Sequence, residues 1–407
     1  SGHSGTKGEM IALRIVAEAG RMLGAERLIP IASAHIDGCL YHGKSGTLFC
    51  EMLVEAGARV FVPATTNVGA LNLLDPLQSR LQGEVRKLAF RLMVAHEKMG
   101  CSPSWTCAPY QAGARPEQGT DVAWGESNAV AFVNSALGAR TNRYGDFLDI
   151  ACAIAGRAPY YGLHVPENRR AALVFDISRI PPSLQAMDIF YPVLGALIGR
   201  RSGEAVVAVT GLQATPDDDN LKALFAGAAA TGAVGLLHVV GVTPEAADLA
   251  RVTGGDPSLP RVCVDEQMLR AERDHLSTLA PGARIDCVAM GSPHLSAREC
   301  QQILALTGDR KFSVPVYLCT GRHTMHALAR TGADMALKAL GAVFVVDTCV
   351  VVTPVLPEFP GVMMTNSAKF AHYGEGNTGH ATVLGSMQSC IASAQAGKIV
   401  PDDRGSL

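Results

Sequence analysis

Short hydrophobic runs alternate with amphipathic segments through the second half of the chain. Strands are predicted at 205–210, 235–242, 261–264, 285–290, 314–319 and 342–352. Helices are predicted between them, at 220–230, 244–251, 266–279, 296–306 and 325–340. Regular alternation of this kind is typical of an α/β fold with doubly wound, mostly parallel sheets.

The first half is less regular. A helix is predicted at 10–23, followed by a βαβ unit with strands at 27–33 and 58–63 around a helix at 47–56. Residues 66–150 are expected to be helical and rich in loops, and 81–99 is the clearest helix there. The Pro-containing segment Ile180–Ser183 is a candidate boundary between the two halves.

Composition narrows the class of protein. Of 407 residues, 48% are hydrophobic and 18% are charged, which is typical of a compact soluble enzyme. A net charge of −2 gives no electrostatic reason to expect binding to nucleic acid or to an anionic membrane. Residues 1–9 lack the apolar core of a signal peptide, and the longest uncharged apolar stretch, 189–199, is too short to span a bilayer. With eleven scattered cysteines, we expect a cytoplasmic protein.

Reactive side chains follow the predicted strands. Polar clusters containing Cys, His, Ser, Asp or Lys end the segments 286–294, 316–323, 343–349 and 363–369. Ligands bind at the carboxyl ends of strands in open α/β sheets. The pattern therefore favours an active site with metal-ligand chemistry, whereas ordinary buried thiols are the simpler explanation for any single cysteine.

One motif points to a different function. Gly38–Ser45 fits the phosphate-loop pattern between a strand and a helix, and the apolar run 343–347 ends in an Asp that could hold magnesium. The loop interior, Cys-Leu-Tyr-His, is bulky where amides must surround a phosphate, and the Asp is about 300 residues downstream. A nucleotide hydrolase is therefore a remote alternative, although Lys44 and Ser45 could still bind an anionic group.

Many separate motifs carry a family resemblance. They are Ser-Ala-His-Ile-Asp-Gly (33–38), Pro-Ala-Thr-Thr-Asn (63–67), Cys-Ala-Pro-Tyr (107–110), Trp-Gly-Glu-Ser-Asn-Ala (124–129), Asn-Ser-Ala-Leu-Gly-Ala-Arg-Thr-Asn-Arg (134–143), Gly-Arg-Ala-Pro (156–159), Gly-Ser-Pro-His (291–294), Asp-Thr-Cys (347–349) and Asn-Ser-Ala-Lys (366–369). Across nearly its whole length, the chain resembles the large subunit or large domain of the aconitase X family.

The resemblance implies an aconitase-like, multi-layer α/β fold and dehydration at an iron–sulfur cluster. It also implies a small swivelling domain, fused or separate, that completes the site. We expect an N-terminal domain at 1–185, a doubly wound domain at 186–344 and a segment at 345–407 that returns to the active site.

The family motifs place two cluster ligands at Cys107 and Cys349, since thiolates are the usual ligands. Many relatives have Cys where this chain has Ser292, so a third thiolate must come from elsewhere. Cys39 is the preferred substitute. The competing residues are Cys101, Cys152 and Cys319. The departure leaves both a two-iron and a four-iron cluster open.

Dehydrating a β-hydroxy acid requires a base, a Lewis acid or proton donor, and a cation for the carboxylate. The catalytic candidates are Lys369 as base or anion holder, His35 as donor to the leaving oxygen, and Ser367. The candidates for substrate binding are Ser33, Thr65, Thr66, Asn67, Glu126, Ser127, Asn128, Arg140, Arg143, His294 and Asn366. Helix capping by 126–128 and a salt bridge of either arginine are the structural alternatives.

The favoured reaction is dehydration of cis-3-hydroxy-L-proline, a small hydroxy acid, to Δ1-pyrroline-2-carboxylate. Dehydration of mevalonate 5-phosphate within the same family is the first alternative. A non-catalytic, cluster-binding subunit of a two-chain complex is another.

Overall fold

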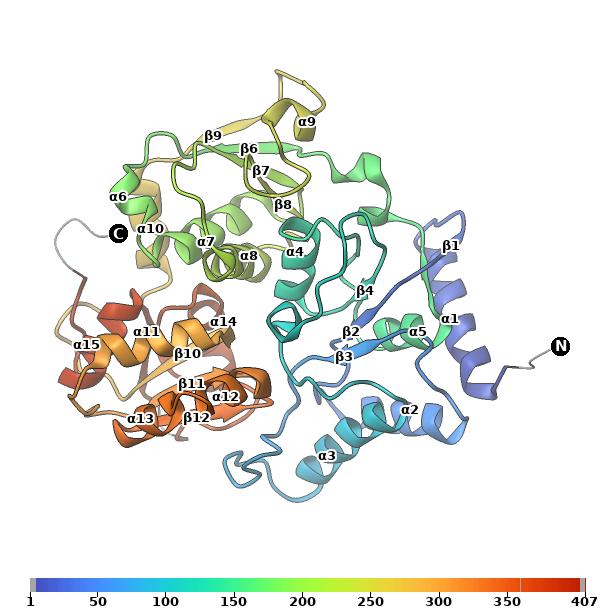
Figure 1. The fold of residues 1–407 in the computed structure, drawn as a ribbon, viewed down its shortest axis with the longest axis horizontal. Helices are drawn as coiled ribbons and strands as arrows, with labels where there is room; N and C mark the ends of the chain where they lie inside the picture. The colour runs from blue at the N-terminus through green and yellow to red at the C-terminus, as the bar shows by residue number, and fades with distance from the viewer. Residues whose placement is uncertain (1–4, 359, 403–406) are drawn as a thin grey trace.

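The computed structural model describes residues 5–358, 360–402 and 407. They form three lobes in the order of the chain (Figure 1). Among the described residues, no helix is both long and apolar enough to cross a membrane. The expected α/β character is present, because each lobe contains a parallel sheet packed against helices.

The N-terminal lobe contains a three-stranded parallel sheet in the order β3-β2-β4 and a separate antiparallel pair, β1-β5. Its strands are β1 (Leu28–Pro30), β2 (Ala34–Ile36), β3 (Ala64–Thr66), β4 (Ala123–Trp124) and β5 (Arg157–Pro159). Its helices are α1 (Lys7–Met22), α2 (Lys44–Glu55), α3 (Gly83–Lys98), the 3-10 turn η1 (Pro109–Ala112), α4 (Ser127–Ser135) and α5 (Leu148–Ala155).

The βαβ unit exists, but its strands are not those predicted. It consists of β2, α2 and β3, with β2 and β3 parallel, whereas β1 pairs antiparallel with β5. The predicted strand at 58–63 does not form. The amide N–H of Val60 donates to Met99 O and that of Phe61 to Ala153 O. These N–H groups are therefore paired with residues at the ends of helices and are not available to a neighbouring strand.

The central lobe is a four-stranded parallel sheet in the order β8-β7-β6-β9. Its strands are β6 (Leu173–Asp176), β7 (Val207–Thr210), β8 (Leu237–Val239) and β9 (Arg261–Cys263). Its helices are η2 (Gly162–His164), η3 (Pro166–Arg169), α6 (Pro182–Gln185), α7 (Phe190–Ser202), α8 (Asp218–Thr231), α9 (Leu249–Thr253) and α10 (Glu266–His275). Strand β6 pairs with β7, although the predicted domain boundary at residue 185 separates them.

The C-terminal lobe is a five-stranded parallel sheet in the order β12-β11-β10-β13-β14. Its strands are β10 (Cys287–Leu295), β11 (Val316–Thr320), β12 (Ala342–Val346), β13 (Val362–Thr365) and β14 (Ala381–Leu384). Its helices are α11 (Ala297–Thr307), α12 (Arg322–Ala329), α13 (Ala333–Ala339), α14 (Ala368–Thr378) and α15 (Met387–Ala396). Strand β13, which follows the predicted boundary at residue 345, pairs with β10, which precedes it. The predicted boundary therefore falls inside this sheet.

Two predicted helices of the second half differ in extent. The helix expected at 325–340 is split into α12 and α13, because Gly332 between them has a φ of 73°, outside the helical region. The helix expected at 244–251 is limited to α9, where the side chain of Asp248 caps the N-terminus by accepting from Arg251 N.

Candidate active site

Strand ends of two sheets meet between the N-terminal and C-terminal lobes. Glu126 follows β4, and Lys369 follows β13 in the first turn of α14. Lys369 Nζ lies 2.5 Å from Glu126 Oε1, and Ser127 Oγ lies 3.5 Å from the same nitrogen. The carboxyl ends of parallel strands are where the sequence placed the site, and this ion pair joins two of them.

Both members of the ion pair are charged in this arrangement. Burial alone would raise the pKa of Glu126, but the ammonium of Lys369 and the backbone N–H donors at the start of α4 outweigh it and lower that pKa. Burial would lower the pKa of Lys369, yet the Glu126 carboxylate outweighs it and raises that pKa. At neutral pH the site therefore holds a buried carboxylate against a buried ammonium.

His294 connects the loops that carry the two predicted cluster ligands. Its backbone N–H lies 3.3 Å from Cys107 Sγ, and its Nε2 lies 3.1 Å from Thr348 O, next to Cys349. A carbonyl can only accept, so Nε2 carries the proton and Nδ1 accepts from Thr106 Oγ1 at 3.0 Å. Burial lowers the pKa of His294 to about 3, so the ring is neutral and acts as a brace between these loops.

Cys107 and Cys349 are close enough to influence each other. Burial raises the pKa of Cys107 to about 12 and that of Cys349 to about 11, while Lys369 acts to lower both. Thr348 Oγ1, next to Cys349, and Asn128 Oδ1, whose amide nitrogen donates to Cys107 O, are buried and have no partner among the described residues. Two thiols beside a cation and an N–H donor, with polar atoms left unpaired, fit an iron–sulfur cluster.

The third ligand is not decided by this geometry. No set of three or more His, Cys, Asp and Glu side chains is arranged as metal ligands within residues 5–358 and 360–402. Burial, then the charges of Asp37, Asp149 and Cys101, raise the pKa of Cys39 well above its usual value. Its thiol lies 3.3 Å from both Ile36 O and Asn67 O, to which it can donate.

The competing thiols fall into two groups. Cys101 and Cys152 have Asp149 as their main charged neighbour, and Asp149 also acts on Cys39, after Asp37. Cys319, in β11, is instead close enough to Cys349 and Cys107 for both thiols to influence its pKa. The assignment of Cys39 remains a prediction, and Cys319 is the competitor that lies with the two expected ligands.

Ser367 has a structural role in this arrangement. Its Oγ accepts from Phe370 N and so caps α14, and it donates to Ser292 O. Asn366, Ser367 and Lys369 line a narrow cavity of about 30 Å³ together with Ser292. The Asn-Ser-Ala-Lys motif therefore positions Lys369 at a cavity wall.

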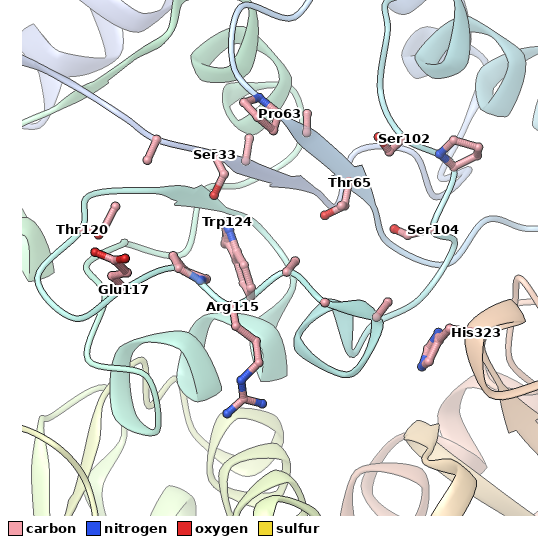
Figure 2. Close-up of a pocket in the computed structure, with 18 of the residues that line it drawn as sticks. Ser33, Pro63, Thr65, Ser102, Ser104, Arg115, Glu117, Thr120, Trp124 and His323 are labelled. Atoms are coloured by element: carbon pink, nitrogen blue, oxygen red, sulfur yellow. The ribbon is translucent and has the colours of Figure 1, made fainter. Parts of the chain in front are cut away.

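A larger cavity of about 830 Å³ lies beside the three-stranded sheet (Figure 2). Ser33, Thr65 and Trp124 line it, with His323 from the C-terminal lobe on its rim. His35 Nδ1 lies 2.8 Å from Thr65 Oγ1, and burial lowers its pKa to about 4. The predicted residues Ser33 and Thr65 are thus near a cavity, although not the one beside Lys369.

The other predicted substrate contacts are engaged within the protein or lie elsewhere. Thr66 Oγ1 contacts Ser102 O at 3.4 Å and accepts from Trp105 N, and Asn67 donates to Asp37 Oδ1. Asn128 donates to Cys107 O and Tyr110 Oη. Arg143 is exposed, and Arg140 lines a separate cavity. Glu126, the N-cap of α4, accepts from Ala129 N, so capping and the ion pair coexist in it.

The phosphate-loop alternative loses its magnesium ligand. Asp347 is buried and accepts from Arg322 Nε and Nη2 at 2.7 Å each, and from Leu73 N. It follows β12, which is in a different sheet from β2, the strand that precedes the Gly38–Ser45 loop. Lys44, the first residue of α2, is exposed.

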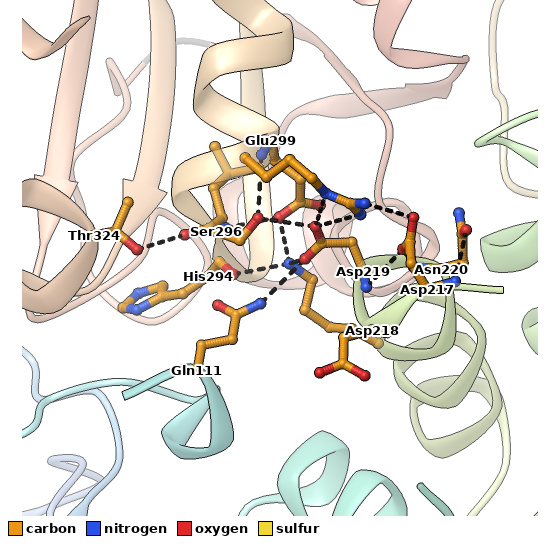
Figure 3. Close-up of polar contacts among 12 residues, drawn as sticks. Gln111, Asp217, Asp218, Asp219, Asn220, His294, Ser296, Glu299 and Thr324 are labelled. Carbon is orange, nitrogen blue, oxygen red and sulfur yellow. Dashed lines mark hydrogen bonds and ion pairs between the residues drawn. The ribbon is translucent and has the colours of Figure 1, made fainter. Parts of the chain in front are cut away.

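A buried network that the sequence did not indicate supports His294. Lys222, in α8 and 2% exposed, donates to His294 O at 3.2 Å, to Asp219 Oδ1 at 3.1 Å and to Glu299. Figure 3 shows Asp219 and Glu299 converging beside His294. A Lys near the start of a helix is usually a surface residue, so only the tertiary packing of α8 and the ion pair with Glu299 of α11 identify this one.

Comparisons with known proteins identify the family of the chain. Models for the first, second and third domains of aconitase X match residues 1–167, 171–274 and 285–396. A cis-3-hydroxy-L-proline dehydratase of Pseudomonas aeruginosa is 39% identical, over 95% of this chain and 67% of its own. A phosphomevalonate dehydratase large subunit of Methanothermobacter thermautotrophicus is 36% identical, over 93% of this chain and 92% of its own.

A crystal structure of Thermococcus kodakaraensis aconitase X in its holo-form superimposes with a TM-score of 0.85 at 31% identity, covering 95% of each chain. The aconitase-like fold expected from the sequence is thereby confirmed. With all three domain models matched in order along the sequence, the chain belongs to the aconitase X family.

Proposed function

We propose that this chain is the large catalytic part of a hydro-lyase that converts cis-3-hydroxy-L-proline to Δ1-pyrroline-2-carboxylate. The observation that carries the proposal is the buried ion pair of Lys369 and Glu126 beside Cys107 and Cys349. The 39% identity to a cis-3-hydroxy-L-proline dehydratase supports the substrate. All eleven cysteines are free thiols, which suits the proposed cytoplasmic location.

The ion pair suits an elimination. Because Lys369 is cationic here, its proposed role is to bind the substrate carboxylate rather than to take the α-proton. A carboxylate bound to Lys369 would weaken the hold of the ammonium on Glu126. Burial would then raise the pKa of Glu126 and make it a stronger base, suited to accept the proton from C2.

Loss of the C3 hydroxyl needs an electrophilic group, since Glu126 supplies only the base. The residues that would hold an iron–sulfur cluster are Cys107 and Cys349, with Cys39 or Cys319 as the third candidate. A bound cluster supplies Lewis-acid chemistry for a leaving hydroxide. Elimination of the C2 proton and the C3 hydroxide as water leaves the enamine, which isomerises to the cyclic imine.

The test is an anaerobic reconstitution with iron and sulfide, followed by incubation with cis-3-hydroxy-L-proline and aminobenzaldehyde. We expect colour from the cyclic imine, and its loss in Glu126→Gln, which keeps size but removes the base. Cys107→Ser and Cys349→Ser should lose bound iron, because a hydroxyl is a poor cluster ligand, whereas Cys263→Ser, at the exposed cysteine, should keep it. Full iron content in both Cys107→Ser and Cys349→Ser would contradict the ligand assignment.

A partner domain is part of the proposal. The chain spans 67% of the Pseudomonas aeruginosa relative, and other relatives are named as large subunits. The proposed site lies at strand ends between two lobes, and we expect it to exclude water only when another domain covers it. We therefore expect little turnover by this chain alone, and recovery when the remaining segment of that relative is added. Full activity of the isolated chain would contradict this.

Phosphomevalonate is the second candidate substrate, because five large subunits of phosphomevalonate dehydratases match this chain over 89–95% of their length. The same reconstituted protein should be offered phosphomevalonate. Turnover of phosphomevalonate without turnover of hydroxyproline would replace the first proposal with the second.

A further inference from the structure

A cavity lined by arginines lies between the N-terminal and central lobes, apart from the site described above. Its volume is about 270 Å³. The lining residues that matter here are Arg140, Arg169, Arg170, His238, Glu245 and Arg251. None of them lines the cavities beside Lys369 or Trp124. The cavity is therefore not part of the proposed catalytic site.

One arginine of this cavity is fully engaged. Arg169 is 5% exposed and donates from Nε to both carboxylate oxygens of Glu245 at 3.0 Å. Its other nitrogens donate to Asn134, Leu163 and Ala139. Glu245, the acidic residue on the lining, is thereby neutralised, and it leaves no carboxylate for the other arginines.

Three guanidinium groups remain without a partner. Within the described residues, the side chains of Arg140, Arg170 and Arg251 make no hydrogen bond or ion pair, and Arg140 Nε is buried. Burial lowers the pKa of Arg169, and the charge of Arg140 acts in the same direction. Three guanidinium groups on one cavity lining, without a carboxylate of the protein to pair with, favour an anion between them.

Another lining residue, His238, carries a buried acceptor. His238 is 2% exposed, and its Nε2 lies 2.7 Å from Arg169 O, so Nε2 carries the proton. Burial lowers its pKa, so the ring is neutral. Nδ1 is then a bare acceptor, and it is buried without a partner among the described residues. A buried polar atom without a partner is rare in a folded protein, and this acceptor calls for an O–H donor, from a hydroxyl or protonated oxygen of a ligand or from an ordered water.

We propose that this cavity binds a small oxyanion with at least two negative charges, either a phosphate ester or a polycarboxylate. Guanidinium forks match phosphate and carboxylate oxygens in pairs, and three free forks match more than one charge. The cavity is smaller than the usual site of a drug-sized ligand, which limits the occupant to a compact anion. Its lining comes from two lobes, so a bound anion would hold them together.

The probes are inorganic phosphate and citrate, each titrated calorimetrically into the intact chain at pH 7.5. Sodium chloride at equal ionic strength is the reference, because screening alone changes exposed charges. The test variant is Arg170→Gln/Arg251→Gln. Both side chains are exposed and unpaired, so we expect its melting temperature without anion to equal that of the wild type. The matched control is Arg14→Gln/Arg201→Gln, which removes two exposed, unpaired arginines elsewhere.

We expect phosphate, citrate or both to bind, and the test variant to bind about tenfold more weakly or worse, since two charge-assisted contacts are lost. The control should bind as the wild type does. Phosphate binding alone would identify a phosphate ester site, and citrate binding alone a polycarboxylate site. The proposal is overturned if neither anion differs from chloride, or if the test variant retains the wild-type affinity.

Discussion

Replacing Lys222 with Met tests the buried network behind His294. Met is close to Lys in length and apolar, so the substitution removes the charge with little change in packing. Asp219 keeps Arg298, whose Nε and Nη2 lie 3.0 and 2.7 Å from Asp219 Oδ2. Glu299 keeps only the N–H of Ser296 and no cation. His294 O also loses its donor (Figure 3).

The magnitude follows from the buried charge that remains. Removing one partner of a buried ion pair costs about 3–5 kcal/mol, because the other charge stays desolvated. Since Asp219 retains Arg298, we expect Lys222→Met to lower the free energy of unfolding by about 3 kcal/mol at pH 7.5. Burial already raises the pKa of Glu299, and without Lys222 it should rise further. Glu299 in the folded variant then binds a proton more readily than in the unfolded chain. The loss in free energy of unfolding relative to the wild type should therefore shrink as the pH falls.

The assay is urea unfolding followed by circular dichroism at pH 7.5 and pH 5.5. The matched control is Lys338→Met, which removes an ammonium that is 47% exposed and 3.7 Å from Asp334, and should cost about 0–1 kcal/mol. Lys222→Met/Glu299→Gln should be more stable than Lys222→Met alone, because no unpaired carboxylate remains. Equal unfolding free energies for Lys222→Met and Lys338→Met would refute this reasoning.

Two further predictions concern other parts of the fold. His96 is buried, and burial lowers its pKa from 6.5 to about 4. Its contribution to the free energy of unfolding is therefore fully present above pH 6.5 and is lost as the pH falls toward 4. Between pH 7.5 and pH 5, urea unfolding should show the wild type losing about 2 kcal/mol more than His96→Gln, and parallel pH profiles would contradict this. A Cβ on Gly195 would lie 2.1 Å from Leu224 O, so Gly195→Ala should lower the melting temperature by forcing α7 away from α8. Gly376→Ala, in α14 where nothing lies within 4 Å, should leave it unchanged or raise it, and a similar loss in both variants would argue against the close approach.

The sequence by itself determined what depends on neighbours along the chain. Helices α8, α10 and α11 lie close to their predicted positions, because burial of one helical face repeats with a period that can be read locally. Ser296 and Glu299 form a capping box that starts α11, and such a signal spans only four residues. The resemblance to the aconitase X family, which rests on short local motifs, also gave Cys107 and Lys369 as candidates for the site.

Tertiary structure decided which of these segments meet. Strands β2 and β3 have three residues each, too few for a periodic pattern, so the prediction placed neighbouring apolar runs in the βαβ unit instead. The partition into lobes depends on hydrogen-bonded strand pairs such as β6 with β7, which no local period reveals.

The site depended on tertiary structure most of all. Glu126 and Lys369 are 243 positions apart, and each alone resembles a helix cap or a surface charge. Lys222 has no sequence signal, since a lysine is ordinarily solvated. Its burial follows from the tertiary packing of α8, which brings Glu299 of α11 to the ammonium beside Asp219 of the same helix. Long-range packing sets which charges are desolvated, and desolvation gives these side chains their chemistry.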